Sequence, residues 1–193
     1  PRVRRQRQMC IRDRNYAENP KQNFHTLSRM INTMNHRGPD TYGHTIINSC
    51  CLAHTRLSII DLENGRQPMS YTKDGNTYYI VYNGEIYNYK EVKKTLLRKN
   101  YTFETNSDTE VIIAAFCHYG PGFVKELNGI FAIAIYDSMR NTLYLYRDRF
   151  GVKPLYYTKT GDTLVFASRI DTLFEYPRVR PCIDMNSFNE IFS

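Results

Sequence analysis

The stretch that most constrains this chain is GIFAIAIYD at residues 129–137, where every position from Ile130 to Tyr136 is apolar or aromatic. A strand with one face in water alternates apolar and polar residues, whereas a strand covered on both faces reads as one apolar run. The next strand-like run, NTLYLYRD at residues 141–148, follows a tight turn, so the two runs predict an antiparallel pair. We therefore expect sheets that are buried between layers of helix.

Two segments predict helices by their apolar spacing and their end signals. The first begins near Lys21 and ends at the HRGPD turn of residues 36–40, whose Gly-Pro pair stops a helix. The second is SDTEVIIAAFCHYG, with Ser107 or Asp108 as its N-cap and a Gly-Pro pair at residues 120–121 as its end. The apolar residues at helical spacing are Phe24, Leu27, Met30 or Ile31, and Met34 in the first helix, and Val111, Ile112, Ala115 and Phe116 in the second.

Further strand signals lie on both sides of the second helix. The segments TIINSCCLAHTRLSII at residues 45–60 and NTYYIVY at residues 76–82 are rich in β-formers, and an Asp-Gly turn signal precedes the second. TLVFAS at residues 163–168 follows a Gly-Asp turn, and a short helix is expected before Pro177. The pattern predicts one domain with both helices and antiparallel strands.

Composition limits the class of protein. A chain of 193 residues with 41% hydrophobic content can bury one good core. No apolar run reaches the roughly 18 residues of a membrane span, and the start lacks the apolar centre of a signal peptide, so we expect a cytoplasmic protein that does not bind membranes. The cysteines form no C-x-x-C pair, so we expect reduced thiols and no metal site. They are Cys10, Cys50, Cys51, Cys117 and Cys182.

The formal charge of +7 is concentrated at the start of the chain. Residues 1–14 hold six arginines against one acid, Asp13, so this head carries +5 of the +7. A basic arm that binds nucleic acid is one interpretation of such a run, and a disordered or non-native leader is the other. We favour the leader and expect no nucleic-acid partner, because the rest of the chain has no basic stripe with interleaved aromatic residues.

Several polar residues lie within or next to apolar runs, where the fold alone does not explain them. Arg56 sits in an apolar run, and a buried guanidinium is costly unless it meets a carboxylate. That carboxylate is either an internal partner, Asp61 or Glu63, or part of a ligand. Spacing alone leaves the two alternatives open.

Two further polar groups also have a structural and a functional interpretation. Asn83 and Gly84 follow an apolar strand, and this pair is either a hairpin turn or an oxyanion hole that points at a carbonyl oxygen. Asp108 is either a helix cap or a carboxylate that holds the ammonium group of a substrate.

Taken in order, six motifs resemble one family. They are HRGPD, AHTRLSIIDLENGRQPM, VYNGEIYNY, NSDTEVI, LNGIFAIAIYD and RDRFGVKPLYY, and the resemblance that they carry runs from about His36 to about Phe174. This set is similar to the glutaminase domain of glutamine-hydrolysing asparagine synthetases, which are class II amidotransferases with an N-terminal nucleophile. The resemblance implies an α+β fold, a four-layer αββα sandwich of the N-terminal-nucleophile hydrolase type. That fold agrees with strands that are covered on both faces.

The resemblance also implies a glutamine site. Arg56 would bind the α-carboxylate of glutamine, while Asp108 and Glu85 would hold its α-ammonium group. Asn83 and Gly84 would stabilise the oxyanion that forms as a thiolate attacks the side-chain amide. The backbone that forms the adjoining wall would be that of Leu57, Ser58, Ile59 and Ile60.

Cys10 stands where the family has its nucleophile. In this family Met is removed from a Met-Cys start, and the α-amine of the freed cysteine, with a pKa of about 7.7 to 8, accepts the thiol proton. The family pattern continues Cys-Gly-Ile-x-Gly, whereas Ile-Arg-Asp-Arg follows here, and three charges would be costly in a buried strand. Nine residues also precede Cys10. We therefore interpret residues 1–14 as a foreign or disordered head on a domain whose first strand is lost, and expect little activity from the chain as it stands.

The resemblance implies a larger protein. Residues 15–176 would form the amidotransferase domain, and residues 177–193 would begin a linker to a C-terminal synthetase domain that is absent from this chain. The glutaminase domain would need no cofactor, and ATP and Mg would bind only in the synthetase domain, where ammonia amidates aspartate. The expected partners are glutamine and that domain, and a homodimer stays open. Two alternatives are a catalytically dead glutamine-binding module and an amidotransferase domain of a related synthetase that acts on another acid.

Overall fold

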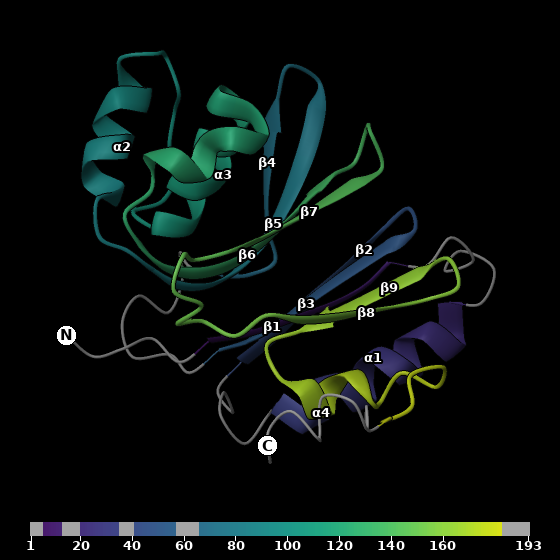
Figure 1. The fold of residues 1–193 in the computed structure, drawn as a ribbon. Coiled ribbons are helices and arrows are strands. Elements are labelled where there is room, and N and C mark those ends of the chain that lie inside the picture. Colours follow the sequence, from purple (N-terminus) through teal and green to yellow (C-terminus); the bar gives the residue numbers. More distant parts are fainter. Residues whose placement is uncertain (1–5, 13–19, 35–40, 57–65, 183–193) are drawn as a thin grey trace.

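The structure, a computed structural model, describes residues 6–12, 20–34, 41–56 and 66–182. Nine antiparallel strands form two sheets in this part of the chain (Figure 1). The five-stranded sheet runs in the order β2 (Thr41–Ile47), β3 (Cys50–Arg56), β1 (Gln6–Arg12), β9 (Thr163–Ala167) and β8 (Tyr156–Thr160). The four-stranded sheet runs in the order β4 (Met69–Lys73), β5 (Asn76–Ile86), β6 (Gly129–Asp137) and β7 (Thr142–Arg147).

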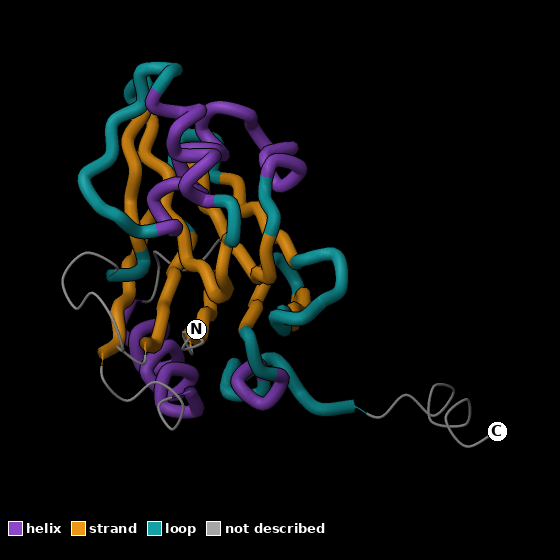
Figure 2. Tube along the Cα trace, turned by 90° about the vertical axis from the view of Figure 1, so that its left-hand side faces the viewer, coloured by secondary structure: helices purple, strands orange, loops and turns teal. Residues whose placement is uncertain are grey.

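Helices cover the outer face of each sheet. Helices α1 (Pro20–Met34) and α4 (Ile170–Leu173) lie on the five-stranded sheet, whereas α2 (Tyr89–Leu97) and α3 (Asp108–Tyr119) lie on the four-stranded sheet. A 3-10 helix at Gly120–Glu126 continues from α3. Figure 2, seen from the side, shows the strands between the two groups of helices. The predicted four-layer αββα sandwich is therefore confirmed.

The strand β6 explains why residues 129–137 are apolar throughout. Its Ala134 and Tyr136 pack between the two sheets, in a cluster with Leu52 of β3. Its Ile133 and Ile135 face the other way and pack in the cluster that contains α3. Both faces of β6 are thus removed from water, as the sequence predicts.

The predicted boundaries of α3 are also confirmed. Ser107 is the N-cap, and its hydroxyl oxygen accepts a hydrogen bond of 3.2 Å from the backbone N–H of Thr109. The helix ends at Gly120, which has a φ of 68°, a left-handed conformation that glycine adopts without steric cost. Because Ser107 caps the helix, the Asp108 side chain is available for a different contact.

The structure differs from the sequence-based expectation at the start of the chain. Gln6–Arg12 form β1, the middle strand of the five-stranded sheet, which pairs with β3 on one side and β9 on the other. The expectation that residues 1–14 lie outside the domain is therefore wrong for these residues. The physical reason is that β3 and β9 would otherwise present unpaired backbone groups to each other inside the sheet, and β1 satisfies both edges.

None of the helices in the described part of the chain has the length and apolar character that crossing a membrane requires.

Candidate active site

Asn83 and Gly84 lie inside β5 and not in a turn. Asn83 pairs with Ala132 and Gly84 with Phe131 of β6, and both residues are buried, Asn83 with only 3% of its surface exposed. The hairpin-turn interpretation is therefore wrong. A Cβ on Gly84 would lie 2.1 Å from the carbonyl oxygen of Ile130, so only glycine fits at this position.

The edge of β5 at Gly84 carries a backbone donor that points away from β6. The N–H of Tyr82 donates to the side-chain oxygen of Gln67 at 2.6 Å and so points to the edge opposite β6. Backbone groups two residues apart in a strand point to the same edge, which puts the Gly84 N–H on this edge as well. The side chain of Asn83 lies on the side of Val81, which packs between the sheets. The pair therefore offers an amide and an N–H from one point of the strand.

Asp108, the first residue of α3, is brought to the same strand. Its carboxylate Oδ2 accepts a hydrogen bond of 3.1 Å from the hydroxyl of Tyr82, the residue before Asn83. Asp108 is 7% exposed and Tyr82 is 1% exposed. The cap interpretation of Asp108 is wrong, because Ser107 is the cap, and the Asp108 carboxylate is instead tied to β5 through the Tyr82 hydroxyl. Glu85, the next residue of β5, is exposed.

The other predicted site residues are placed by their backbone alone or lie outside the described residues. Cys10 is in β1, paired with Leu52 and Phe166, two residues of the core between the sheets. The strand β1, which carries Cys10, is in contact with β5, the strand that carries Asn83 and Gly84. Arg56 is the last residue of β3. The predicted wall residues Leu57, Ser58, Ile59 and Ile60, and the alternative partners Asp61 and Glu63, lie outside the described residues.

Two residues near the site, Tyr82 and Gln67, are additions to the set predicted from sequence. A tyrosine in a buried strand needs a partner for its hydroxyl, and this rule could have pointed to Tyr82. Gln67 is 5% exposed, and its side chain joins β5 to α3, because its Nε2 also donates to the Thr109 hydroxyl at 3.2 Å. No local signal marks Gln67, since its two partners lie 15 and 42 residues further along the chain.

The RDRFG motif supports the site from the other side of β6. The carboxylate of Asp148, 6% exposed, accepts backbone hydrogen bonds from Phe131, Phe150, Val152 and Lys153 at 2.9–3.2 Å. Burial alone would raise the pKa of Asp148, but these four N–H donors outweigh it and lower the pKa below its ordinary value. Because Phe131 pairs with Gly84, Asp148 anchors the strand that supports the candidate oxyanion hole.

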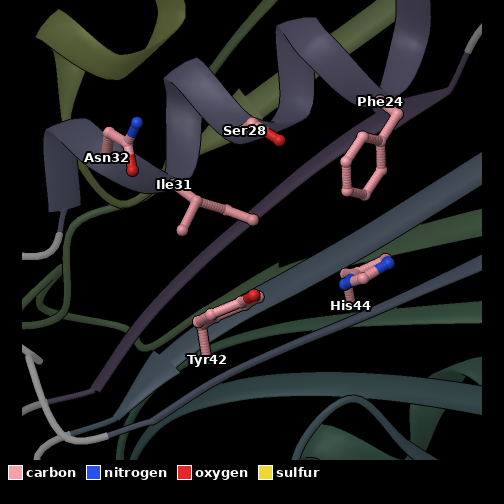
Figure 3. A pocket seen from close by; sticks show the side chains of 6 residues that line it. All are labelled: Phe24, Ser28, Ile31, Asn32, Tyr42 and His44. Carbon is pink, nitrogen blue, oxygen red and sulfur yellow. The ribbon is translucent and has the colours of Figure 1, made fainter. Parts of the chain in front are cut away.

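A separate hollow of about 140 Å³ lies between α1 and the edge strand β2 (Figure 3). Of the predicted site residues that the structure describes, none lines this hollow. Its lining consists of Phe24, Ser28, Ile31, Asn32, Tyr42 and His44. Among the residues that the structure describes, no group of three or more His, Cys, Asp or Glu side chains could hold a metal ion.

Comparison with proteins of known structure agrees with the fold. The chain superposes on the glutamine phosphoribosylpyrophosphate amidotransferase of B. subtilis, solved with ADP and GMP, with a TM-score of 0.72 and 19% identity. This match covers 87% of the present chain and 43% of that enzyme. A second structure, an allosteric regulatory enzyme of purine biosynthesis, matches with a TM-score of 0.74 and 18% identity, over 88% of this chain and 43% of that one.

Comparison of sequences identifies closer relatives. The chain is 41% identical over 167 residues to asparagine synthetase [glutamine-hydrolyzing] 3 of Bacillus subtilis, which covers 86% of this chain and 27% of that protein. Synthetase 2 of the same organism is 47% identical over 154 residues, 80% of this chain and 20% of that protein. Asparagine synthetase B of Escherichia coli is 42% identical over 141 residues, 72% of this chain and 24% of that protein.

The chain therefore spans about a quarter of the length of these relatives. The profile of the glutamine amidotransferase domain matches residues 9–193, a segment that includes Cys10 and all the candidate site residues. The resemblance inferred from the six motifs is confirmed, and the chain belongs to the glutamine amidotransferase domain family, homologous to the N-terminal glutaminase domain of asparagine synthetases.

Proposed function

We propose that this domain hydrolyses glutamine to glutamate and ammonia at the edge of β5. The observation that carries the proposal is the position of Asn83 and Gly84 inside a buried strand, with the Asp108 carboxylate held against the same strand. This arrangement puts oxyanion donors on β5 and an acceptor for an ammonium group at the start of α3, where a hydrogen bond from Tyr82 ties it to β5. A free amino acid that carries a side-chain amide offers the matching groups.

Each residue has one role in the proposed reaction. Arg56, with the backbone of residues 57–60, binds the α-carboxylate of glutamine, and Asp108 and Glu85 bind its α-ammonium group. The Cys10 thiolate attacks the side-chain amide, and Asn83 and Gly84 stabilise the tetrahedral oxyanion. Ammonia leaves as the thioester forms, and water then releases glutamate. In this reaction the domain uses no cofactor.

The second part of the proposal concerns the domain that uses the ammonia. The names of the relatives support a synthetase domain C-terminal to this one, in which ATP and Mg would activate aspartate for amidation. Residues 177–193 would begin the linker to that domain. We place the protein in the cytoplasm, where thiols stay reduced.

A second candidate function is supported by the position of Cys10. This residue lies in the middle of β1 and is joined to Met9 by a peptide bond, so it has no α-amine that could serve as the general base. A domain with this arrangement would bind glutamine without hydrolysing it.

Glutamate release separates the two candidates. A chain that starts at Met9, with Met removed and the new N-terminus confirmed by mass spectrometry, is compared with the chain that starts at Pro1 and with Cys10→Ala in the shortened form. Restoring the base should raise turnover about 10²- to 10⁴-fold, and Cys10→Ala should abolish it. Glutamine binding without turnover in the shortened chain favours the binding module, and turnover that survives Cys10→Ala overturns the assignment of the nucleophile.

A further inference from the structure

We propose that Tyr82 is a positioning residue for substrate recognition, whose hydroxyl holds the Asp108 carboxylate in place to receive the α-ammonium group of glutamine. This inference rests on the proposed function and deepens it, because it names a residue that acts on the substrate through another one.

The contact between the two residues joins elements that are far apart in sequence. Tyr82 lies in β5 and Asp108 begins α3, 26 residues later, and the Tyr82 hydroxyl donates to Oδ2 of Asp108 at 3.1 Å. Both side chains are buried. A hydrogen bond to a carboxylate is directional, and in buried surroundings water does not compete for the acceptor. It fixes the carboxylate relative to the strand that carries the oxyanion donors.

A second pair of hydrogen bonds keeps this geometry rigid. The side chain of Gln67 accepts from the Tyr82 N–H at 2.6 Å and donates to the Thr109 hydroxyl at 3.2 Å. Thr109 follows Asp108 in the first turn of α3. The strand edge and the start of the helix are therefore tied together twice, once through the Tyr82 hydroxyl and once through Gln67.

The position of Tyr82 in the strand explains how it can act without contacting the substrate. Successive side chains of a strand point to opposite faces. Tyr82 packs in the cluster beneath α3, whereas its neighbour Asn83 lies on the side of the opposite sheet. Tyr82 thus sets the distance between the acceptor for the ammonium group, Asp108, and the oxyanion donors, while its own ring stays in the core.

A matched pair of ligands isolates this role. Calorimetry measures the binding of glutamine and of 5-amino-5-oxopentanoate, which is glutamine without its α-amino group, to the full chain. Tyr82→Phe removes the hydroxyl and keeps the ring. It should weaken glutamine binding roughly tenfold, the loss of about 1.4 kcal/mol expected from one hydrogen bond to a charged group. Binding of the des-amino ligand should not change, because that ligand makes no contact with Asp108.

Tyr146→Phe is the matched control. Tyr146 packs against the same cluster as Tyr82, and its buried hydroxyl has no hydrogen-bond partner among the described residues. Its loss should change the affinity for neither ligand. Circular dichroism and thermal unfolding check that each variant is folded.

The outcomes separate the inference from the proposed function. Equal affinity of the parent chain and Tyr82→Phe for glutamine, or an equal loss for both ligands, overturns the positioning role while glutamine binding stands. Failure of the parent chain to bind glutamine overturns the proposed function, and this inference with it. If Tyr82→Phe does not fold, Tyr82→Leu, which also removes the hydroxyl and keeps an apolar side chain in the cluster beneath α3, must show the same selective loss of glutamine affinity.

Discussion

Replacing Asp148 by asparagine tests how the RDRFG motif holds the fold. Each carboxylate oxygen of Asp148 accepts two backbone N–H groups, Oδ1 from Phe150 and Val152 and Oδ2 from Phe131 and Lys153. An asparagine side chain puts an NH₂ donor in place of one oxygen, so two N–H groups lose their acceptor. A hydrogen bond to a charged group contributes about 1.5–3 kcal/mol, so for two such bonds we expect a loss of about 3–6 kcal/mol in the free energy of unfolding.

Urea unfolding measures this loss. With a slope of about 2 kcal/mol per molar urea, the midpoint at pH 7 should fall by about 1.5–3 M. Asp74→Asn is the control, because the Asp74 side chain is 85% exposed, and it should change stability by less than about 0.5 kcal/mol. A midpoint for Asp148→Asn within 0.3 M of the parent, a margin of roughly 0.6 kcal/mol at this slope, would refute the reasoning.

The pH dependence of the same variant has a definite sign. Because the folded-state pKa of Asp148 is lowered, the charged carboxylate stabilises the fold fully above its unfolded pKa of about 3.9, and this stabilisation is lost as the pH falls through the lower folded pKa. The difference in stability between Asp148→Asn and the parent should therefore shrink below about pH 4. A constant difference from pH 7 to pH 3 would show that the charge contributes nothing.

Two further predictions concern the core of the site and the thiols. Gly84→Ala places a methyl group against a carbonyl oxygen of β6, and thermal unfolding should show a loss of stability of about 1–3 kcal/mol. The control is Gly122→Ala, which should not lower stability because its Cβ would meet open space. Equal melting temperatures of the two variants would contradict the close packing at Gly84. Burial raises the pKa of Cys117 to about 12. At pH 7 a maleimide should therefore label the exposed Cys182 at least about a hundredfold faster than Cys117, as measured by peptide mapping. Similar rates for the two cysteines would contradict the burial of Cys117.

The elements that sequence predicts well are those whose local signals agree with their surroundings. The apolar run of β6 and the cap and stop residues of α3 each indicate one structure, and the fold provides it. The helix α2 was not predicted, because YKEVKKTLL is rich in lysine and only Val92 and Leu96 are buried. The edge strands β4 and β8 were not predicted either, since their residues are half-exposed and each is held by a single neighbouring strand.

Asn83 and Gly84 show how tertiary structure overrides a local preference. An Asn-Gly pair is the commonest signal for a hairpin, but β5 pairs with β6 without interruption from Tyr78 to Ile86. The ladder of hydrogen bonds and the burial of both faces outweigh a turn preference. A choice between turn and oxyanion hole could not be made from these two residues alone, because their partners in β6, Ala132 and Phe131, lie 49 and 47 residues further along the chain.

The candidate site depends on contacts across long stretches of sequence. Asp108 could be identified as a carboxylate at a helix start, and a buried tyrosine such as Tyr82 could be expected to need a partner, but nothing local shows that the two residues are partners. The strand β1 was excluded because of its charges, yet its backbone fills a gap between β3 and β9 that only the assembled sheet reveals.

The most direct test of the glutamine site is calorimetric titration of glutamine into the parent chain and into Arg56→Ala. Removal of one partner of a bidentate carboxylate pair costs several kcal/mol, so Arg56→Ala should weaken binding at least about a hundredfold. Arg66→Ala is the control, because Arg66 is exposed and no site role is assigned to it, and its affinity should match that of the parent. We predict that the parent and Arg66→Ala bind glutamine and that only Arg56→Ala loses this binding. Equal affinity in all three proteins, or no binding by the parent, would contradict the account.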